Sequence, residues 1–323
     1  MMTGVFKSRF NKYLLALIAT LELIVLLFII MVSYQTLSKI ETFADLNFYL
    51  SFLLICVASA AIMGFYLIQF YVKTSPKIVI RDQEISIGSR TINFQDIAAI
   101  DLFSRSKRRQ LRYNEASAIT LEDGTWYEII IDHYANGNLI RNNLGNLNKF
   151  LQREASHFQV TTKLQKPHIP SQFNEQYVIY RRSVFKSFMT YFWAVGMIGT
   201  VALFQVAVQG FGPFIASLLI CSFFYIMAAR STHYFLLSDK YLAVKNLLLP
   251  WKQKIIPLAD ICTVEKYYSP RTDTSLRIVS KDYVLYQYPS GLIGSSLFES
   301  LISEIRTKQN MTEEEVPAAT ELA

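Results

Sequence analysis

The sequence predicts an α+β membrane protein with two transmembrane helical hairpins, four helices in all, and two strand-rich domains that each end in an amphipathic helix. Three observations carry this prediction. The chain contains four long apolar stretches, each pair of them is followed by a strand-rich segment ending in an amphipathic helix, and this order occurs twice in 323 residues. A period of about half the chain indicates two structural units, each made of a membrane hairpin and a domain.

The repeat divides the chain into six predicted segments. They are hairpin 1 (1–73), strand-rich domain 1 (74–154), a connecting segment (155–187), hairpin 2 (188–230), strand-rich domain 2 (231–308) and an acidic tail (309–323). The tail is polar, so we expect it to be disordered. The connecting segment has no counterpart before the first apolar stretch, which makes the expected duplication imperfect.

The four apolar stretches cover 13–34, 49–72, 188–208 and 211–229. About 20 apolar residues in a helix cross a hydrocarbon layer of about 30 Å. Backbone polar groups must be satisfied internally in lipid, so we expect each stretch to be a helix. The turn sequence at 209–213 joins the last two stretches into a hairpin.

The charges at the ends of these stretches predict the topology. The two short loops inside the pairs contain a single basic residue, Lys39, whereas several basic residues flank the outer ends. These are Lys7, Arg9, Lys12, Lys73, Lys77, Arg81, Arg181, Arg182, Lys186 and Arg230. The positive-inside rule then places both termini and both domains in the cytoplasm of a multi-pass plasma-membrane protein.

The strand-rich segments follow one outline. In the second, we expect strands in 232–246, 254–264, 275–280 and 283–288, followed by a helix over 294–308 whose apolar residues recur at helical spacing. In the first, we expect strands in 77–87, 91–100, 118–121 and 126–131, with a helix over 138–152. The best internal match is INFQDI at 92–97 against IPLADI at 256–261, an apolar-x-apolar-x-Asp-Ile pattern between two strands. Two further strands are expected at 157–163 and 176–181.

The motifs LSDKYLAVKN at 237–246 and IIPLADICTVEKYY at 255–268, placed after a pair of apolar stretches, give the chain a resemblance to a known family. It resembles the bacterial pleckstrin-homology-like membrane proteins, most clearly over 232–308 and more loosely over 77–153. The resemblance implies a bent β-barrel with one capping helix in each domain, and a bacterial inner membrane. It carries no catalytic residues to transfer.

Two polar residues lie deep in the apolar stretches. Glu22 is about nine residues into the first stretch, near the bilayer midplane, and Gln205 lies deep in the third. Ionisable residues at such depth are functional candidates by default. For Glu22 we weigh a functional role, as a proton or ligand contact or as a polar lock between helices, against a structural one, a protonated side chain hydrogen-bonded to a neighbouring helix.

A basic cluster lies in a predicted loop of domain 1. It consists of Arg105, Lys107, Arg108, Arg109 and Arg112. Each basic residue near an anionic membrane surface is worth about 1 kcal/mol. Contact with lipid headgroups and an ordinary solvated loop are the two interpretations. A run this short argues against a nucleic-acid partner.

The sequence predicts no catalytic residues, metal site or cofactor. Its three cysteines, Cys56, Cys221 and Cys262, form no paired motif, and no nucleotide-binding or hydrolase motif is present. Asp132-His133 and His233 lack an adjacent nucleophile pattern and are read as structural. We therefore do not expect an enzyme.

The functional hypothesis is a membrane-anchored binding or scaffold protein that presents two cytoplasmic pleckstrin-homology-like domains. Its expected partners are anionic membrane lipids together with a protein partner or further copies of itself. The alternative is a transporter, or an export or immunity component, that handles a peptide or lipid and assembles as an oligomer. Glu22 and Gln205 are the residues that the alternative would use.

Overall fold

The computed structural model describes residues 4–37, 43–108, 114–164, 175–181, 232–268 and 274–314, with short pieces between 191 and 229. The chain divides into two compact units, Met1–Leu164 and Gln165–Ala323. Each unit has its own hydrophobic core.

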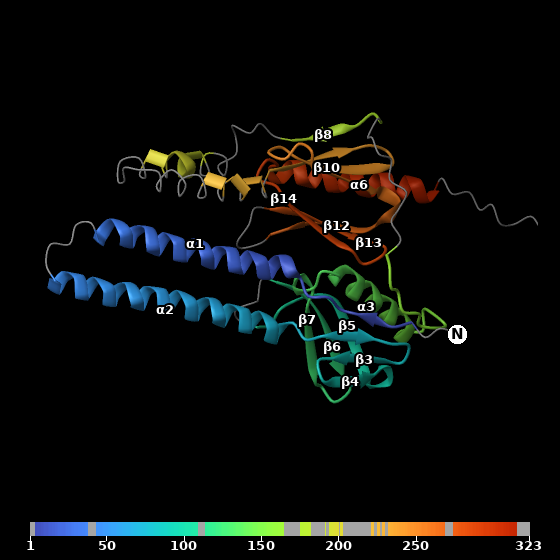
Figure 1. The fold of residues 1–323 in the computed structure, drawn as a ribbon. Coiled ribbons are helices and arrows are strands. Elements are labelled where there is room, and N and C mark those ends of the chain that lie inside the picture. Colours follow the sequence, from blue (N-terminus) through green and yellow to red (C-terminus); the bar gives the residue numbers. More distant parts are fainter. Residues whose placement is uncertain are drawn as a thin grey trace, which may run out of the picture. The chain divides into compact units, whose positions relative to one another are not determined.

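Unit 1 begins with a short strand and a long helical hairpin. β1 (Phe6–Lys7) is followed by α1 (Lys12–Leu37) and α2 (Phe43–Thr74), which lie side by side (Figure 1). Both helices are built from almost unbroken apolar sequence with no proline inside, which is why they run for 26 and 32 residues.

The rest of unit 1 is two antiparallel sheets and a helix. The elements are β2 (Ile78–Ile80), β3 (Glu84–Ile87), β4 (Arg90–Asn93), the 3-10 turn η1 (Phe94–Asp96), β5 (Ile97–Arg105), β6 (Glu115–Leu121), β7 (Trp126–Ile130), the 3-10 turn η2 (Ile131–His133) and α3 (Gly137–Leu151). The sheet orders are β1-β2-β3-β4 and β5-β6-β7. The helix expected over 138–152 is thus confirmed as α3.

Period-two and helical burial patterns explain this core. Alternate isoleucines of β2 and β3 point inward, and Ile78, Ile80 and Ile85 are fully buried. On α3, Ile140 and Leu144 are four residues apart and also fully buried, so this face of the helix covers the sheets.

The described elements of unit 2 follow a similar order, without a counterpart of η2. They are β8 (Val178–Tyr180), β9 (His233–Leu237), β10 (Tyr241–Asn246), β11 (Gln253–Pro257), the 3-10 turn η4 (Leu258–Asp260), β12 (Ile261–Tyr267), β13 (Ser275–Ser280), β14 (Leu285–Pro289) and α6 (Ser295–Glu314). The sheet orders are β11-β10-β9-β8 and β12-β13-β14. The predicted helix over 294–308 is confirmed as α6, which continues to Glu314 and so reaches into the segment expected to be disordered.

The matched six-residue motif has the same structure in both units. In each, the motif leaves a strand, makes a 3-10 turn and enters the next strand, with the first apolar residue of the turn buried: Phe94 is 5% exposed and Leu258 is 1% exposed. The backbone N–H of Phe94 donates to Gln83 O at 3.1 Å, and that of Leu258 donates to Lys240 O at 2.9 Å.

A short strand precedes the hairpin of unit 1, and another precedes segment 182–231 of unit 2. β1 pairs with β2 through Phe6↔Ile80, and β8 pairs with β9 through Val178↔Leu237. The strand expected within 176–181 is therefore confirmed, whereas 157–163 forms no strand. Within the connecting segment, β8 therefore pairs in the same way as β1 does at the N-terminus. The sequence did not predict β1, because a two-residue strand shows no alternation.

The predicted fold class is wrong in both its membrane and its sheet parts. Across the described ranges, one helical stretch, Leu46–Thr74 of α2, is long and apolar enough to cross a membrane, where four were expected. The described strands form four antiparallel sheets and no closed barrel.

The physical reason for the missing barrels is the 3-10 turn. η1 separates β4 from β5, and η4 separates β11 from β12, so these consecutive strands join different sheets and do not pair. The predicted third and fourth spans, 188–208 and 211–229, lie largely outside the described residues. The longest described piece, 194–199, is helical but spans only about 9 Å.

Candidate functional site

The candidate site is the region where the hairpin α1–α2 joins the sheets of unit 1, together with the seam between the two helices. Glu22 of α1 lies directly against Gly64 of α2: a Cβ added at Gly64 would come within 2.7 Å of the Glu22 Cδ atom. Ala60, one helical turn away, is 5% exposed. The small residues at 60 and 64 therefore allow the close approach expected of such a spacing in membrane helices.

The structure thus places Glu22 in the contact between the helices. Its Oε1 atom is buried and has no hydrogen-bond partner among the described residues. Gln205, the second intramembrane candidate, lies outside those residues. Glu22 is therefore packed against Gly64, while its role as a ligand contact or as a polar contact between helices stays a prediction.

Hydroxyl groups within the hairpin are satisfied by their own helix. The Oγ atoms of Thr20, Ser33 and Ser51 donate to the carbonyl oxygens of Ala16, Ile29 and Asn47 at 2.8, 2.6 and 2.9 Å. Bonding to the preceding turn pairs the donor on each of these side chains.

A buried polar joint connects α2 to the end of the β5-β6-β7 sheet. The Tyr71 hydroxyl donates to His133 O at 2.8 Å, and the Nδ1 atom of His133 lies 2.8 Å from Ser75 Oγ. All three residues are at most 5% exposed. Because these bonds join α2 to η2, the hairpin and the sheets are packed as one body at this point.

The surrounding hydrogen bonds and the burial of His133 determine which ring nitrogen carries a hydrogen and whether the ring is charged. Ser75 Oγ donates to Tyr71 O at 2.7 Å, and Thr74 Oγ1 donates to Phe70 O at 2.9 Å. The hydroxyl hydrogens of Ser75 and Thr74 are thus donated to backbone carbonyls. The Nδ1–H of the His133 ring therefore donates to Ser75 Oγ. Burial, and then the positive charge of Arg108, lower the pKa of His133 to about 4, so the imidazole is neutral at pH 7.

The residues just before α1 are hydrogen-bonded to the same joint. The N–H of Asn11 donates to His133 O at 3.0 Å, and the N–H of Ala135 donates to Arg9 O at 2.8 Å. The Tyr134 hydroxyl donates to Pro76 O at 2.6 Å, and burial raises the pKa of Tyr134. Both ends of the hairpin are therefore bonded to residues 133–136.

The basic cluster begins at the C-terminal end of β5, at Arg105, and continues into the loop that follows. Lys107 Nζ sits over the Trp126 ring, 4.6 Å from its centroid, and Arg108 Nε lies 3.4 Å from the Oε2 of Glu128. The Glu128 side chain is only 1% exposed, and its Oε1 accepts the Lys107 N–H at 3.0 Å. Lys107 and Arg108 are thus held against the protein, while Arg105 ends the strand. Arg109 and Arg112 lie outside the described residues.

Sequence reasoning missed one buried cation. Arg141 on α3 is 1% exposed, its Nη2 pairs with Glu115 Oε2 at 3.2 Å, and its Nε donates to Leu102 O at 3.1 Å. It lies one residue after the buried Ile140, and that adjacency to the apolar face is the signal that places it between the helix and the sheet. Its role is to tie α3 to β5 and β6.

No group of three His, Cys, Asp or Glu side chains within the described ranges is placed to hold a metal ion. His233 contacts Pro289 O at 2.9 Å and lies against Tyr288, inside unit 2. Neither a protein-family model nor a curated protein sequence matches this chain.

Proposed function

We propose that this chain is a membrane-anchored binding protein in which the α1–α2 hairpin enters the bilayer and holds unit 1 at the membrane surface. The observation that carries the proposal is the exposed apolar surface of α2, joined to the sheets of unit 1 through the buried joint at Tyr71 and His133.

The side chains of α2 support insertion. Only 11% of its most apolar stretch is buried within the protein. Phe48, Leu54 and Tyr66 are 77%, 73% and 74% exposed. Leaving such side chains in water costs roughly 25 cal/mol per Å² of apolar area, and contiguous exposed apolar surface of this kind marks a membrane or partner contact.

The dimensions and polar groups fit the same proposal. The 29 residues of Leu46–Thr74 rise about 44 Å as a helix, more than the roughly 30 Å hydrocarbon layer. α1 runs beside α2, is equally apolar in sequence, and satisfies its hydroxyls internally. We propose that α2 spans the membrane and that α1 lies along α2.

The charge distribution supports a cytoplasmic unit 1. Lys7, Arg9 and Lys12 precede or begin α1, and Lys73 ends α2, so the basic residues gather at the end of the hairpin that joins the sheets. In a bacterium this corresponds to the inner membrane. Lys107 and Arg108 add positive charge to the same unit and can meet anionic headgroups.

The role we propose is presentation of β-rich units to a protein or lipid partner. The shared element order of the two units supports an origin by duplication. A relationship to the bacterial pleckstrin-homology-like membrane proteins is also proposed, on the two sequence motifs alone. Fold-level likeness of this kind supports binding in general and identifies no ligand.

Cysteine labelling tests the placement. In a chain whose native Cys56, Cys221 and Cys262 are replaced by Ser, Asp123→Cys in the exposed β6–β7 turn reports on unit 1, and Ser38→Cys reports on the connection between α1 and α2. In intact cells an impermeant maleimide is expected to label Ser38→Cys and to spare Asp123→Cys until the membrane is opened. Labelling of both positions in intact cells, or of neither after permeabilisation, contradicts the proposal.

A further inference from the structure

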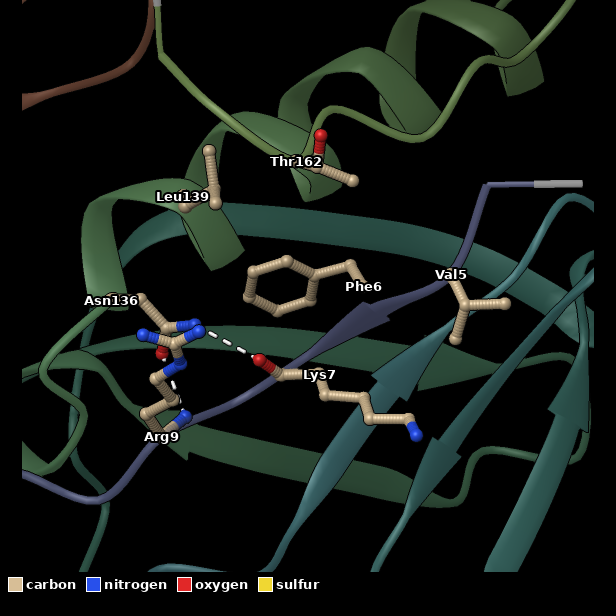
Figure 2. Close-up of a pocket in the computed structure, with 7 residues that line it drawn as sticks. All are labelled: Val5, Phe6, Lys7, Arg9, Asn136, Leu139 and Thr162. Atoms are coloured by element: carbon tan, nitrogen blue, oxygen red, sulfur yellow. Dashed lines mark hydrogen bonds between the residues drawn. The ribbon is translucent and has the colours of Figure 1, made fainter. Parts of the chain in front are cut away.

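A cleft of about 710 Å³ lies beside the N-terminal strand β1, and two of its lining residues, Arg9 and Asn136, are also bonded to each other beside the joint. Its lining residues are Val5, Phe6, Lys7, Arg9, Asn136, Leu139 and Thr162. Figure 2 shows the Phe6 ring lying between β1 and α3, with Leu139 and Thr162 on the opposite wall. Its volume falls within the range of small-molecule sites.

The charged side chains that line this cleft are all positive. Lys7 and Arg9 are both exposed, and no acidic side chain is among the lining residues of the described chain. None of the ion pairs formed between described residues uses either cation. Two cations without a protein counter-charge favour an anionic ligand.

The cleft is also rigid on the cationic side. Asn136 pairs with the backbone of β1 as a neighbouring strand would: its Nδ2 donates to Lys7 O at 3.0 Å, and its Oδ1 accepts the Arg9 N–H at 2.8 Å (Figure 2). The Arg9 side chain runs toward Asn136, whereas the Lys7 side chain extends away along the strands. Because this backbone is already held, only the two side chains have to be ordered when a ligand binds.

The position of the cleft close to the start of α1 favours a lipid headgroup over a free anion as the ligand. Arg9 precedes the first residue of α1, Lys12, by three residues, which reach at most about 11 Å. If α1 enters the bilayer, as the proposed function requires, Arg9 lies within the headgroup layer. The guanidinium of Arg matches the oxygens of a phosphate in a bidentate manner, and Phe6 and Leu139 provide an apolar wall.

We propose that the β1 cleft binds the phosphate headgroup of an anionic membrane lipid, with Arg9 as its main contact and Lys7 at the rim. This inference rests on the proposed membrane insertion of the hairpin. It adds a specific lipid site to what would otherwise be general attraction between basic residues and the membrane.

The test uses the full chain in a neutral detergent and native mass spectrometry with added phosphatidylglycerol or phosphatidylcholine. The variant Lys7→Gln/Arg9→Gln removes both cations of the cleft. The matched control, Lys12→Gln/Lys73→Gln, removes the same charge from the base of the hairpin without touching the cleft. A third variant, Thr162→Trp, fills the cleft from its exposed wall and keeps every charge.

We expect the wild-type chain and the control to retain phosphatidylglycerol in preference to phosphatidylcholine, and the cleft variants to bind it at least about tenfold more weakly. Equal losses in the control and in Lys7→Gln/Arg9→Gln, or normal binding by Thr162→Trp, overturn the proposal. Inorganic phosphate separates the sources: displacement of the lipid at millimolar phosphate assigns the site to free phosphate and overturns the lipid assignment.

Membrane association of the same variants separates this inference from the proposed function. Lys7→Gln/Arg9→Gln should remain in the membrane fraction after alkaline carbonate extraction, because the helices are unchanged. Release of the wild-type chain by carbonate would contradict the membrane proposal itself, whereas loss of lipid retention in a membrane-bound variant concerns the cleft alone.

Discussion

At the scale of single residues, His133 is the titratable group on which the joint depends. Its pKa is lowered from 6.5 to about 4, so the unfolded chain binds more protons than the folded chain between these values. The contribution of neutral His133 to the free energy of unfolding is therefore fully present above about pH 6.5. It is lost as the pH falls toward 4, by about 3 kcal/mol in total.

Thermal unfolding of the full chain in detergent between pH 7 and pH 4 measures this loss. His133→Asn keeps a donor near the Nδ1 position and does not titrate, so its unfolding temperature should fall much less over the same interval. His157→Asn, at an exposed position, is the matched control and should behave like the wild type. If His133→Asn retains the full pH dependence, another group is responsible.

A second residue-scale prediction concerns the seam of the hairpin. Gly64→Ala places a methyl group 2.7 Å from the Glu22 Cδ, and the flexible Glu22 side chain has to rotate away, at a cost of about 1 kcal/mol. Adding Glu22→Ala should remove most of that penalty, because the obstructing atoms are gone.

The denaturation midpoint of the hairpin in detergent measures both variants. Gly199→Ala is the control, since an added Cβ there meets no described atom within 4 Å. A double variant no more stable than Gly64→Ala alone would show that Glu22 is not the group that needs the glycine.

At the scale of elements, the two-residue strand β1 is expected to contribute far more than its length suggests. Phe6 is 3% exposed within the core of unit 1, whereas its neighbour Val5 is 41% exposed. Phe6→Ala should lower the free energy of unfolding by about 3 kcal/mol, and Val5→Ala by less than about 1 kcal/mol. Protease resistance of unit 1 in the full chain measures the difference, and equal effects would mean that β1 is not part of the core.

At the scale of the whole molecule, the membrane proposal predicts opposite outcomes for two charges on α2. Ile62, near the middle of the helix, is 63% exposed, and Val72, near its end, is 53% exposed. In a bilayer Ile62→Asp costs about 3 kcal/mol and Val72→Asp much less, because the cost of a charge depends on its depth. In water both substitutions would be tolerated equally.

Fractionation after alkaline carbonate treatment gives the readout. Ile62→Asp should shift the chain from the membrane pellet or reduce its level, while Val72→Asp should leave the chain in the pellet. Equal recovery of both variants in the soluble fraction would place α2 in contact with water or with another protein instead.

The sequence by itself determined the local structure of this protein. Alternation and helical spacing are properties of short windows, and they placed α3, α6 and the strands around the INFQDI and IPLADI motifs close to where they lie. Tertiary structure alone decided which of these elements pair. The pairing of Phe6 with Ile80, the bond from Tyr71 to His133 and the contact of Glu22 with Gly64 join residues more than 40 positions apart. The same limit explains the wrong barrels: a strand pattern specifies an extended segment, but whether it pairs with the strand before it or the strand after it depends on how the intervening 3-10 turn redirects the chain.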